Sequence, residues 1–301
     1  MKTRNKLSQF SIQTETVIGF PFEWCFVSGG EVTLPDASDY GGSTGGHYRV
    51  GDFAIGKYLI TNGQYISFVE HPNGFCKPLW WDFSPQGNQW RKDHPHPKPT
   101  AFEGRDLPVT RLSWFDSVAF CNWLSSELDV PVRLPTEQEW QRATVEDTGW
   151  SYPWENEFDE TFGNFMKRLG KVSPVGSLPA GQSPFGVMDT IGNLSEWCLT
   201  SWSTDSTELA GYPYRVIRGC AWNAGTPEYL RATDRGLGWS PRGRLNDCFL
   251  LLILPQILSP QSPQLQKSPR HRESSMPDEP RCPRDSLRRC HQFLLACYPG
   301  R

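Results

Sequence analysis

The sequence lacks any long hydrophobic run. No stretch of 18 consecutive apolar residues occurs among its 301 residues, and the segment from Met1 to Phe10 lacks the apolar core of a signal peptide. The chain also lacks a strong charge of either sign, because 30 Lys and Arg against 33 Asp and Glu leave a net charge of −3. This balance gives no global electrostatic reason to bind nucleic acid or an anionic membrane. We therefore expect a cytoplasmic protein whose partners are neither nucleic acids nor membranes.

Two further absences concern metal sites and repeats. Nine cysteines are scattered along the chain without a C-x-x-C pair, and no histidine cluster has zinc spacing, so a structural zinc site is not predicted. No internal repeat is visible, and the short apolar runs between Gly and Pro do not alternate regularly between strand and helix patterns. This argues against a doubly wound parallel sheet and favours an α+β fold with much irregular structure.

Aromatic residues and turn formers are abundant instead. Thirteen Trp, 27 Gly and 26 Pro indicate a loop-rich domain with an aromatic core. The segment 255–301 differs, since it is rich in Pro, Ser, Gln and Arg and has too few apolar residues to bury the surface that ordering requires. We predict an N-terminal segment over residues 1–15, one domain over residues 16–254 and a disordered tail over residues 255–301.

Three capping patterns predict helices. A first helix is expected after Thr61, whose hydroxyl can cap it while Gln64 reaches back to the Thr61 N–H. A second, with apolar residues at helical spacing, follows Ser113, and a short third follows Thr136 with its partner Glu139. The expected strands are residues 31–34, 53–58 and 216–219, with the apolar run 249–254 as a candidate buried last strand.

The order of several motifs along the chain is more specific than any one of them. These motifs are Phe26–Glu31, Phe53–Tyr65, Leu107–Val109, Leu112–Trp114, Ala119–Leu124, Arg133–Trp140, Tyr152–Trp154, Asp189–Trp197 and Arg218–Trp222. Together they resemble the sulfatase-modifying-factor family, whose members include the formylglycine-generating enzymes. The resemblance implies a C-type-lectin-like α+β domain, rich in loops, with two main helices and short strands.

The motif that begins at Asp189 carries oxygen ligands. A carboxylate, a Gly-Asn turn and a second carboxylate seven residues on can supply the ligands that a hard cation such as calcium requires. In the family that the chain resembles, this segment binds calcium, which implies ligation by the side chains of Asp189 and Glu196 and by the carbonyls of Gly192 and Leu194. The alternative is a metal-free turn in which Asp189 accepts hydrogen bonds from nearby N–H groups.

A second calcium site of the same family begins at the Asn of a Gly-Asn segment, which is Asn164 in this chain. Here Lys167, Arg168 and Lys171 follow where acidic residues would be needed. Because positive charge opposes a divalent cation, we predict that this second site is lost.

Two segments, Arg218–Trp222 and Leu230–Arg235, enclose an irregular run over residues 223–229. The formylglycine-generating enzymes that the chain resembles hold copper(I) in this region with two cysteines, because copper(I) requires soft thiolate ligands. The corresponding positions lie near Ala224 and Tyr229, and neither is cysteine. Cys220 comes too early and is interpreted as a compact apolar residue of a strand. We therefore expect no copper, and catalysis is disfavoured.

An iron-dependent alternative stays open. The sulfoxide synthases that resemble this family take their iron ligands largely from an additional helical domain. The histidines available here are His47, His71, His94 and His96, although their interpretation as surface residues is favoured. The alternative function is an oxygen-dependent oxidoreductase of the formylglycine-generating or the iron-dependent sulfoxide-synthase type.

The enclosed run is predicted to be a ligand-binding surface. It resembles the variable region of diversity-generating-retroelement proteins, in which exposed residues near the C-terminus vary on a fixed C-type-lectin-like framework. Large rigid aromatics such as Tyr229 and Trp239 are suited to anchoring an interface. We expect a protein or another ligand to bind the surface spanning residues 223–246, called the 223–246 surface below. Its expected ligand-binding residues are Asn223, Ala224, Thr226, Glu228, Tyr229, Asp234, Leu237, Trp239, Ser240, Arg242, Arg244 and Asn246.

Overall fold

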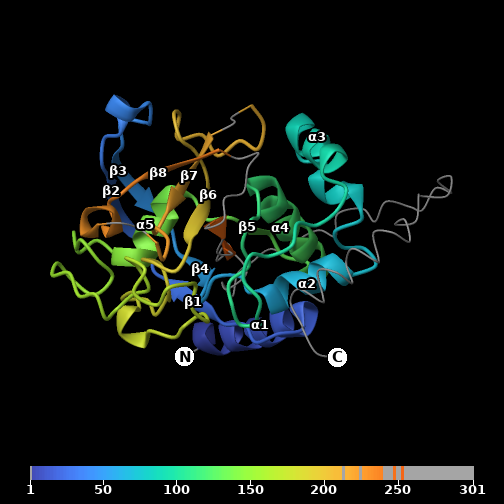
Figure 1. The fold of residues 1–301 in the computed structure, drawn as a ribbon, viewed down its shortest axis with the longest axis horizontal. Coiled ribbons are helices and arrows are strands. Elements are labelled where there is room, and N and C mark those ends of the chain that lie inside the picture. Colours follow the sequence, from blue (N-terminus) through green and yellow to red (C-terminus); the bar gives the residue numbers. More distant parts are fainter. Residues whose placement is uncertain (1, 212–213, 224–225, 240–246, 249–251, 254–301) are drawn as a thin grey trace.

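The computed structural model describes residues 2–211, 214–223, 226–239, 247–248 and 252–253 (Figure 1). The α-helices are α1 (Lys2–Ile18), α2 (Asn62–Glu70), α3 (Pro85–Asp93), α4 (Trp114–Leu128) and α5 (Glu137–Val145). The short 3-10 helices are η1 (Ser38–Tyr40), η2 (Pro78–Trp81), η3 (Pro179–Gly181) and η4 (Pro227–Leu230). The strands are β1 (Trp24–Val27), β2 (Gly30–Leu34), β3 (Gly46–Val50), β4 (Phe53–Gly56), β5 (Val132–Arg133), β6 (Ser195–Ser201), β7 (Tyr214–Arg218), β8 (Gly236–Trp239), β9 (Asp247–Cys248) and β10 (Leu252–Ile253).

The three predicted helices are confirmed together with their capping residues. At the start of α2, the Thr61 side chain accepts a hydrogen bond from the Gln64 N–H, and the Gln64 side chain accepts one from the Thr61 N–H. The same reciprocal pair precedes α4 at Ser113 and α5 at Thr136. Each pair satisfies two backbone donors near the helix start, one of them a donor that the helix itself leaves unpaired. Four consecutive residues therefore fix where each helix begins.

Two helices were not predicted. α1 covers most of the segment 1–15, which was set apart from the domain, yet its Leu7, Phe10 and Ile18 belong to the main core. Packing against β1, α2 and α4 orders this helix, and such distant contacts leave no local pattern. α3 is a mostly polar helix capped by Ser84, a start signal that lacks an apolar stripe to accompany it.

The described strands form two four-stranded sheets and one hairpin. The first sheet has the order β1-β4-β10-β5, so the predicted last strand is present at residues 252–253, between β4 and β5. β2 and β3 form the antiparallel hairpin. The second sheet has the order β8-β7-β6-β9, in which only β6 and β9 are parallel. The strands predicted near residues 31, 53 and 216 correspond to β2, β4 and β7.

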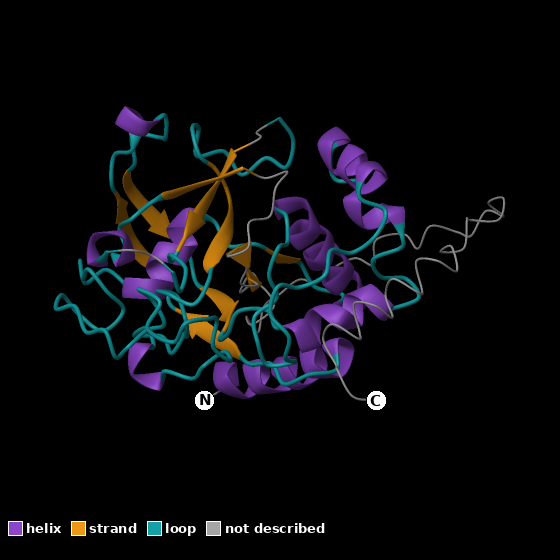
Figure 2. Ribbon diagram, in the orientation of Figure 1, coloured by secondary structure: helices purple, strands orange, loops and turns teal. Residues whose placement is uncertain are grey.

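Loops occupy much of the molecule, as expected for this fold class. Between α5 and β6, residues 146–194 contain only η3 as a regular element (Figure 2). A large core surrounds α2 and α4, and a smaller one contains Trp140, Phe165 and Val216. α5 packs against β2, β3, β6 and β7, which places its N-terminal end beside the segments that precede β8. Within the described part of the chain, no helix is long and apolar enough to span a bilayer.

Candidate functional site

The candidate site is built around Glu137, the first residue of α5. Its carboxylate is fully buried and accepts hydrogen bonds from Nη1 of Arg218 at 2.8 Å and from Nε and Nη2 of Arg235 at 2.7 and 2.6 Å. Arg218 is the last residue of β7, and Arg235 directly precedes β8. One carboxylate thus joins both ends of the loop 219–234. We call these three residues the buried frame.

The buried frame has further contacts beyond its ion pairs. Arg218 also donates to the carbonyl of Ala232, inside the loop. Arg235 donates to the carbonyl of Pro35 at 3.0 Å and to the hydroxyl of Ser43 at 3.0 Å. The loop is therefore fixed both to α5 and to the segment that follows β2. The arginines were predicted as framework residues, but their shared partner was not.

The backbone leaves β7 through a tight turn. Gly219 has a φ of 87°, and a side chain there would approach the Thr190 carbonyl oxygen to 2.6 Å, so the position requires glycine. Cys220 follows at a φ of 54°, half-buried and two residues beyond β7, which corrects its predicted place on a strand. Burial raises the pKa of the Cys220 thiol to about 11. The thiol is consequently protonated at neutral pH.

Among the predicted ligand-binding residues inside the buried frame, three have exposed side chains, whereas other residues of the loop, such as Leu230 and Ala232, are buried. Asn223 and Thr226 are exposed, and Tyr229 in η4 is 59% exposed. Asp234, next to the frame, is half-buried. The predictions for Ala224, Ser240, Arg242, Arg244 and Asn246 fall outside the described residues, as do the side chains of Glu228, Leu237 and Trp239. Of the last three, Leu237 and Trp239 lie on β8, opposite Val216 and Tyr214 of β7.

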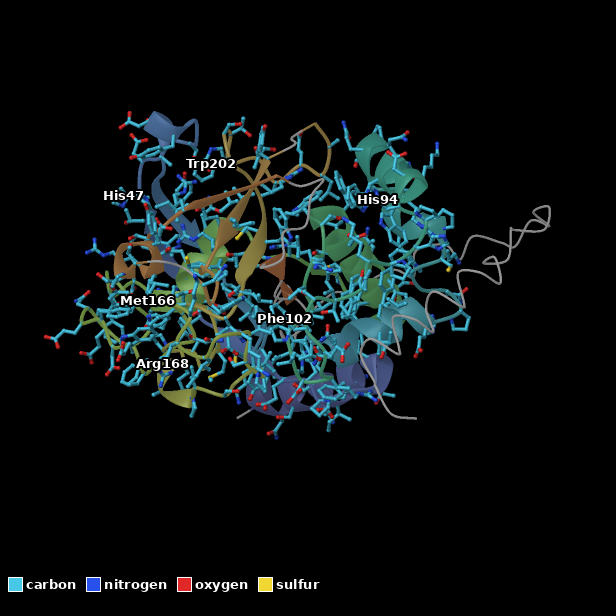
Figure 3. All side chains as sticks on the ribbon, in the orientation of Figure 1. His47, His94, Phe102, Met166, Arg168 and Trp202 are labelled. Carbon is cyan, nitrogen blue, oxygen red and sulfur yellow. The ribbon has the colours of Figure 1, made fainter. Side chains whose placement is uncertain are left out.

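The histidines considered as iron ligands lie in separate surroundings. The His47 ring is hydrogen-bonded to Thr33 at 2.9 Å, whereas the His94 ring stacks on Trp90 with the centroids 3.5 Å apart. Figure 3 shows His47 and His94 on opposite sides of the molecule. Among the described residues, no three His, Cys, Asp or Glu side chains come together in a way that could hold a metal ion. The fold does not bring these histidines into one site.

Two of the predicted calcium ligands are carboxylates, of which Glu196 is fully buried and Asp189 is half-buried. Asp189 accepts a hydrogen bond from the Gly176 N–H at 2.7 Å, and Glu196 on β6 accepts one from Nε1 of Trp140 at 2.9 Å. The second oxygen of Glu196, Oε1, is buried without a hydrogen-bond partner. Burial raises the pKa of Asp189 to about 6. Burial also raises the pKa of Glu196, and the negative charge of Asp189 adds to this rise.

The turn between these carboxylates is held from both sides. Gly192 has a φ of 90° and donates its N–H to the Gly219 carbonyl at 2.7 Å, which ties the turn to the loop after β7. The Asn193 side chain accepts from the Ser173 N–H and donates to the Ser173 carbonyl. Leu194, the other predicted carbonyl ligand, is buried directly before β6. The turn is therefore fixed by the protein, and the partnerless Glu196 oxygen is the atom that a cation would satisfy.

Asn164, where the second calcium site would begin, is also buried. Its amide donates to the carbonyl of Lys171 at 2.9 Å, while its Oδ1 has no hydrogen-bond partner. The side chains of Lys167, Arg168 and Lys171 are exposed. The loss of this second site stays a prediction.

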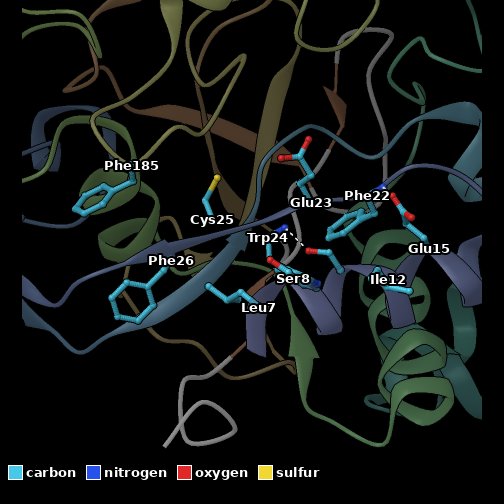
Figure 4. A pocket seen from close by; sticks show the side chains of 11 residues that line it. Leu7, Ser8, Ile12, Glu15, Phe22, Glu23, Trp24, Cys25, Phe26 and Phe185 are labelled. Carbon is cyan, nitrogen blue, oxygen red and sulfur yellow. Dashed lines mark hydrogen bonds between the residues drawn. The ribbon is translucent and has the colours of Figure 1, made fainter. Parts of the chain in front are cut away.

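The structure also contains a cavity outside the 223–246 surface. It has a volume of about 780 Å³ and lies between α1 and β1, where Ile12, Glu23 and Phe26 are among the lining residues (Figure 4). None of its lining residues belongs to the 223–246 surface. This cavity was not predicted, because one of its walls, α1, was not predicted.

The element order, the two small sheets and the framed loop define a C-type-lectin-like domain. Residues 21–243 match the sulfatase-modifying factor enzyme 1-like domain, and the chain belongs to this family. The hercynine oxygenase of Mycobacterium tuberculosis is 29% identical over 212 residues, which cover 61% of this chain and 48% of that protein. The inactive C-alpha-formylglycine-generating enzyme 2 of Mus musculus is 29% identical over 227 residues, which cover 62% of this chain and 69% of that protein.

A solved structure shares the fold at low sequence identity. Treponema denticola variable protein 1 superposes with a TM-score of 0.56 at 19% identity, covering 78% of this chain and 95% of that chain. At this identity the likeness concerns the fold alone. The chain spans about half the length of the hercynine oxygenase that it matches.

Proposed function

We propose that the chain binds a protein or another ligand through the 223–246 surface and has no catalytic activity there. The observation that carries the proposal is the position of Tyr229, which is 59% exposed on a loop whose two ends are joined through Glu137. A large rigid aromatic side chain buries much area on binding at little entropic cost. A loop with fixed ends also needs little reorganisation when it binds.

Two comparisons support binding rather than catalysis. The mouse relative is named as inactive, and a variable protein shares the fold. In this chain Tyr229 stands near a position where the copper-dependent enzymes it resembles have cysteine, and phenol oxygen is a poor ligand for copper(I). The ligand is expected to be neither nucleic acid nor membrane, since the net charge is only −3.

A peptide library displayed on phage tests the proposed surface. The full chain is immobilised, and the enriched peptides are synthesised and titrated against wild type and the Tyr229→Ala variant. Loss of a central aromatic anchor costs roughly 2 kcal/mol of binding, or about thirtyfold in Kd. Leu79→Ala is the matched control, because Leu79 is 55% exposed on η2, outside the 223–246 surface. If no peptide is enriched, or if both variants bind equally, the proposed surface is wrong.

The second candidate function is an oxygen-dependent oxidoreductase, of the formylglycine-generating or the iron-dependent sulfoxide-synthase type. The 29% identity to a hercynine oxygenase favours it. Purified protein is loaded with copper(I) or iron(II), and its metal content is measured by mass spectrometry. Oxygen consumption is then followed with a cysteine peptide, and with hercynine and cysteine. Stoichiometric metal together with substrate-dependent oxygen uptake would replace the binding proposal with this one.

We also propose that Asp189 and Glu196 hold a structural calcium ion, together with the carbonyls of Gly192 and Leu194. Neither carboxylate forms a salt bridge with a described residue. Burying two such charges is unfavourable unless a cation compensates them. The partnerless Oε1 of Glu196 supports the same conclusion. Bound calcium would supply the missing charge and would tie the turn to β6.

Melting curves with calcium and with a chelator test this site. A ligand that binds only the native state adds stability by mass action, so the chelator should lower the Tm of wild type. Asp189→Asn should remove the response, whereas Asp39→Asn, an exposed residue of η1, should keep it. A wild-type curve that the chelator does not shift would favour the metal-free turn.

A further inference from the structure

A second pocket adjoins the 223–246 surface at Asp234. It has a volume of about 400 Å³ and is formed by three segments that are distant in the sequence. Its lining residues are Pro35, Asp36, Ala37, Tyr40, Trp202, Thr233, Asp234 and Arg235. Trp202 lies near the end of the β2–β3 hairpin in Figure 3. The volume lies within the range of small-molecule and side-chain binding pockets.

The wall that follows β2 is held by backbone hydrogen bonds. Ala37 N–H donates to the Ser43 carbonyl, and Ser43 N–H donates to the Trp202 carbonyl, both at 3.0 Å. A side chain at Gly42 would meet Ala37 at 2.8 Å and the Trp202 ring at 2.9 Å, so the turn packs closely on the ring. These contacts are made within the protein itself, so they hold this wall of the pocket in place.

The charges that line the pocket are unbalanced. All of the hydrogen bonds of the Arg235 guanidinium go to Glu137, Asp205 and the segment from Pro35 to Ser43, and its side chain is only 3% exposed. The carboxylate of Asp234 makes no hydrogen bond or salt bridge with any described residue, although it is half-buried. Asp36 accepts a hydrogen bond from the Ser38 N–H, which lowers its pKa and keeps it ionised. Burial raises the pKa of Asp234, and the positive charge of Arg218 acts against this rise. The pocket therefore presents two carboxylates, and no uncommitted cation is among its lining residues.

We propose that this pocket binds an ammonium or guanidinium group on an alkyl stem, with Asp234 as its main partner. The proposal rests on the proposed function, since Asp234 belongs to the 223–246 surface. The head group would pair with Asp234 and Asp36, and the apolar stem would lie along the aromatic ring of Trp202. Tyr40 is 84% exposed and Trp202 is 6% exposed, so one ring stands at the rim and the other forms the floor. Cations are attracted to aromatic ring faces as well as to carboxylates. Because the Arg235 guanidinium already lies over the Trp202 ring, 5.6 Å from its centroid, Trp202 would contact the apolar stem, and the Tyr40 ring would contact the cation.

Calorimetric titration of the full chain tests the proposed ligand chemistry. The probes are agmatine as a free amine, Nα-acetyl-arginine methylamide as the peptide-linked form, and the matching citrulline derivative as an uncharged isostere. Both cationic probes should bind saturably, and the citrulline derivative should bind at least about tenfold more weakly, because a charge-assisted hydrogen bond is lost. A clear preference for one cationic probe would distinguish a small amine from a partner's side chain.

Variants locate the binding within the pocket. Asp234→Asn should weaken the binding of the cationic probes by about tenfold or more. Tyr40→Ala should weaken their binding by a few fold. Asp39→Asn is the control, because Asp39 is exposed on the same turn but does not line the pocket. Circular dichroism and the Tm check that each variant is folded. Because Tyr40 is exposed, Tyr40→Ala should remain folded, and it tests the pocket even if Asp234→Asn unfolds.

The outcomes separate this proposal from the proposed function. If neither cationic probe binds, or if Asp234→Asn and Tyr40→Ala bind them as wild type does, the pocket proposal is wrong. In that case phage-derived peptides that depend on Tyr229 would still support the 223–246 surface. If the cations bind through Asp234 while no peptide depends on Tyr229, the pocket is supported and the wider surface is not.

Discussion

The buried frame and the exposed residues of the loop that it encloses differ in burial and in their contacts. Glu137, Arg218 and Arg235 are joined by ion pairs with almost no solvent exposure, whereas Asn223 and Tyr229 are exposed. Changing a buried ion-pair partner leaves an uncompensated charge, while changing an exposed side chain alters few contacts. This scaffold therefore separates the residues that hold the loop from the residues that can contact a ligand. Such a division lets the surface change without loss of the fold.

The largest expected effect comes from breaking the frame. Glu137→Ala leaves two arginines without their shared carboxylate, and we expect a loss of about 3–5 kcal/mol of unfolding free energy. Urea denaturation followed by fluorescence measures this loss. Glu127→Ala, an exposed residue of α4, is the control and should change stability by less than about 0.5 kcal/mol. Equal effects of the two substitutions would remove the distinction between frame and surface.

A smaller effect on stability is expected from the half-buried carboxylate of Asp189. Without a cation, the folded-state pKa of Asp189 is about 6, above the ordinary value of 3.8. Protonation of Asp189 therefore stabilises the folded state relative to the unfolded state. This stabilisation is complete below pH 3.8 and is lost as the pH rises through about 6. The loss amounts to about 3 kcal/mol. In chelator, Asp189→Asn should thus be more stable than wild type near about pH 7, and the difference should shrink near about pH 4.

Calcium should reverse this order. When calcium is present near about pH 7, wild type should become more stable than Asp189→Asn, because only wild type retains both carboxylate ligands. Urea denaturation in calcium and in chelator measures both differences. An Asp189→Asn variant that is less stable than wild type in chelator would contradict the claim that the ionised carboxylate is costly to bury.

The fold was largely predictable because its helix starts are encoded locally. The capping pairs at Thr61, Ser113 and Thr136 each lie within four residues, so a single pass along the sequence finds them. α1 was missed because its Leu7 and Phe10 are ordered by packing against distant elements. The motif order identified the family, and the family supplied the C-type-lectin-like fold that no propensity could have specified.

The site was predictable in part. Arg218 and Arg235 were recognised as the ends of a framework, but Glu137 lies 81 and 98 residues away from them in the sequence. No local pattern reports a contact across such a separation, although Glu137 was inside a recognised motif. The pocket at Asp234 was missed for the same reason, since its walls come from three separate segments. Calcium binding and the ligand of the 223–246 surface stay predictions.

A moderate effect on stability is expected at Thr136, the residue that caps α5 next to the buried frame. The Thr136 hydroxyl accepts a hydrogen bond from the Glu139 N–H at the start of α5, one residue before Glu137. Thr136→Ala should therefore cost about 1 kcal/mol, less than the loss of the Glu137 carboxylate. Thr207→Ala, an exposed threonine outside any helix, is the control for removal of a threonine side chain. A cost at Thr136 as large as that at Glu137 would mean that the cap, and not the ion pairs, holds the frame.

The smallest expected effect on stability is at Tyr229, where the effect on binding should be large. Its side chain is 59% exposed, so Tyr229→Ala removes few contacts and should change the unfolding free energy by less than about 0.5 kcal/mol. The urea midpoint and slope of the variant should match those of wild type, while its affinity for phage-derived peptides falls. A loss of stability above about 1.5 kcal/mol would instead place Tyr229 in the supporting structure. The loop could then no longer be regarded as a surface that is free to vary on a fixed frame.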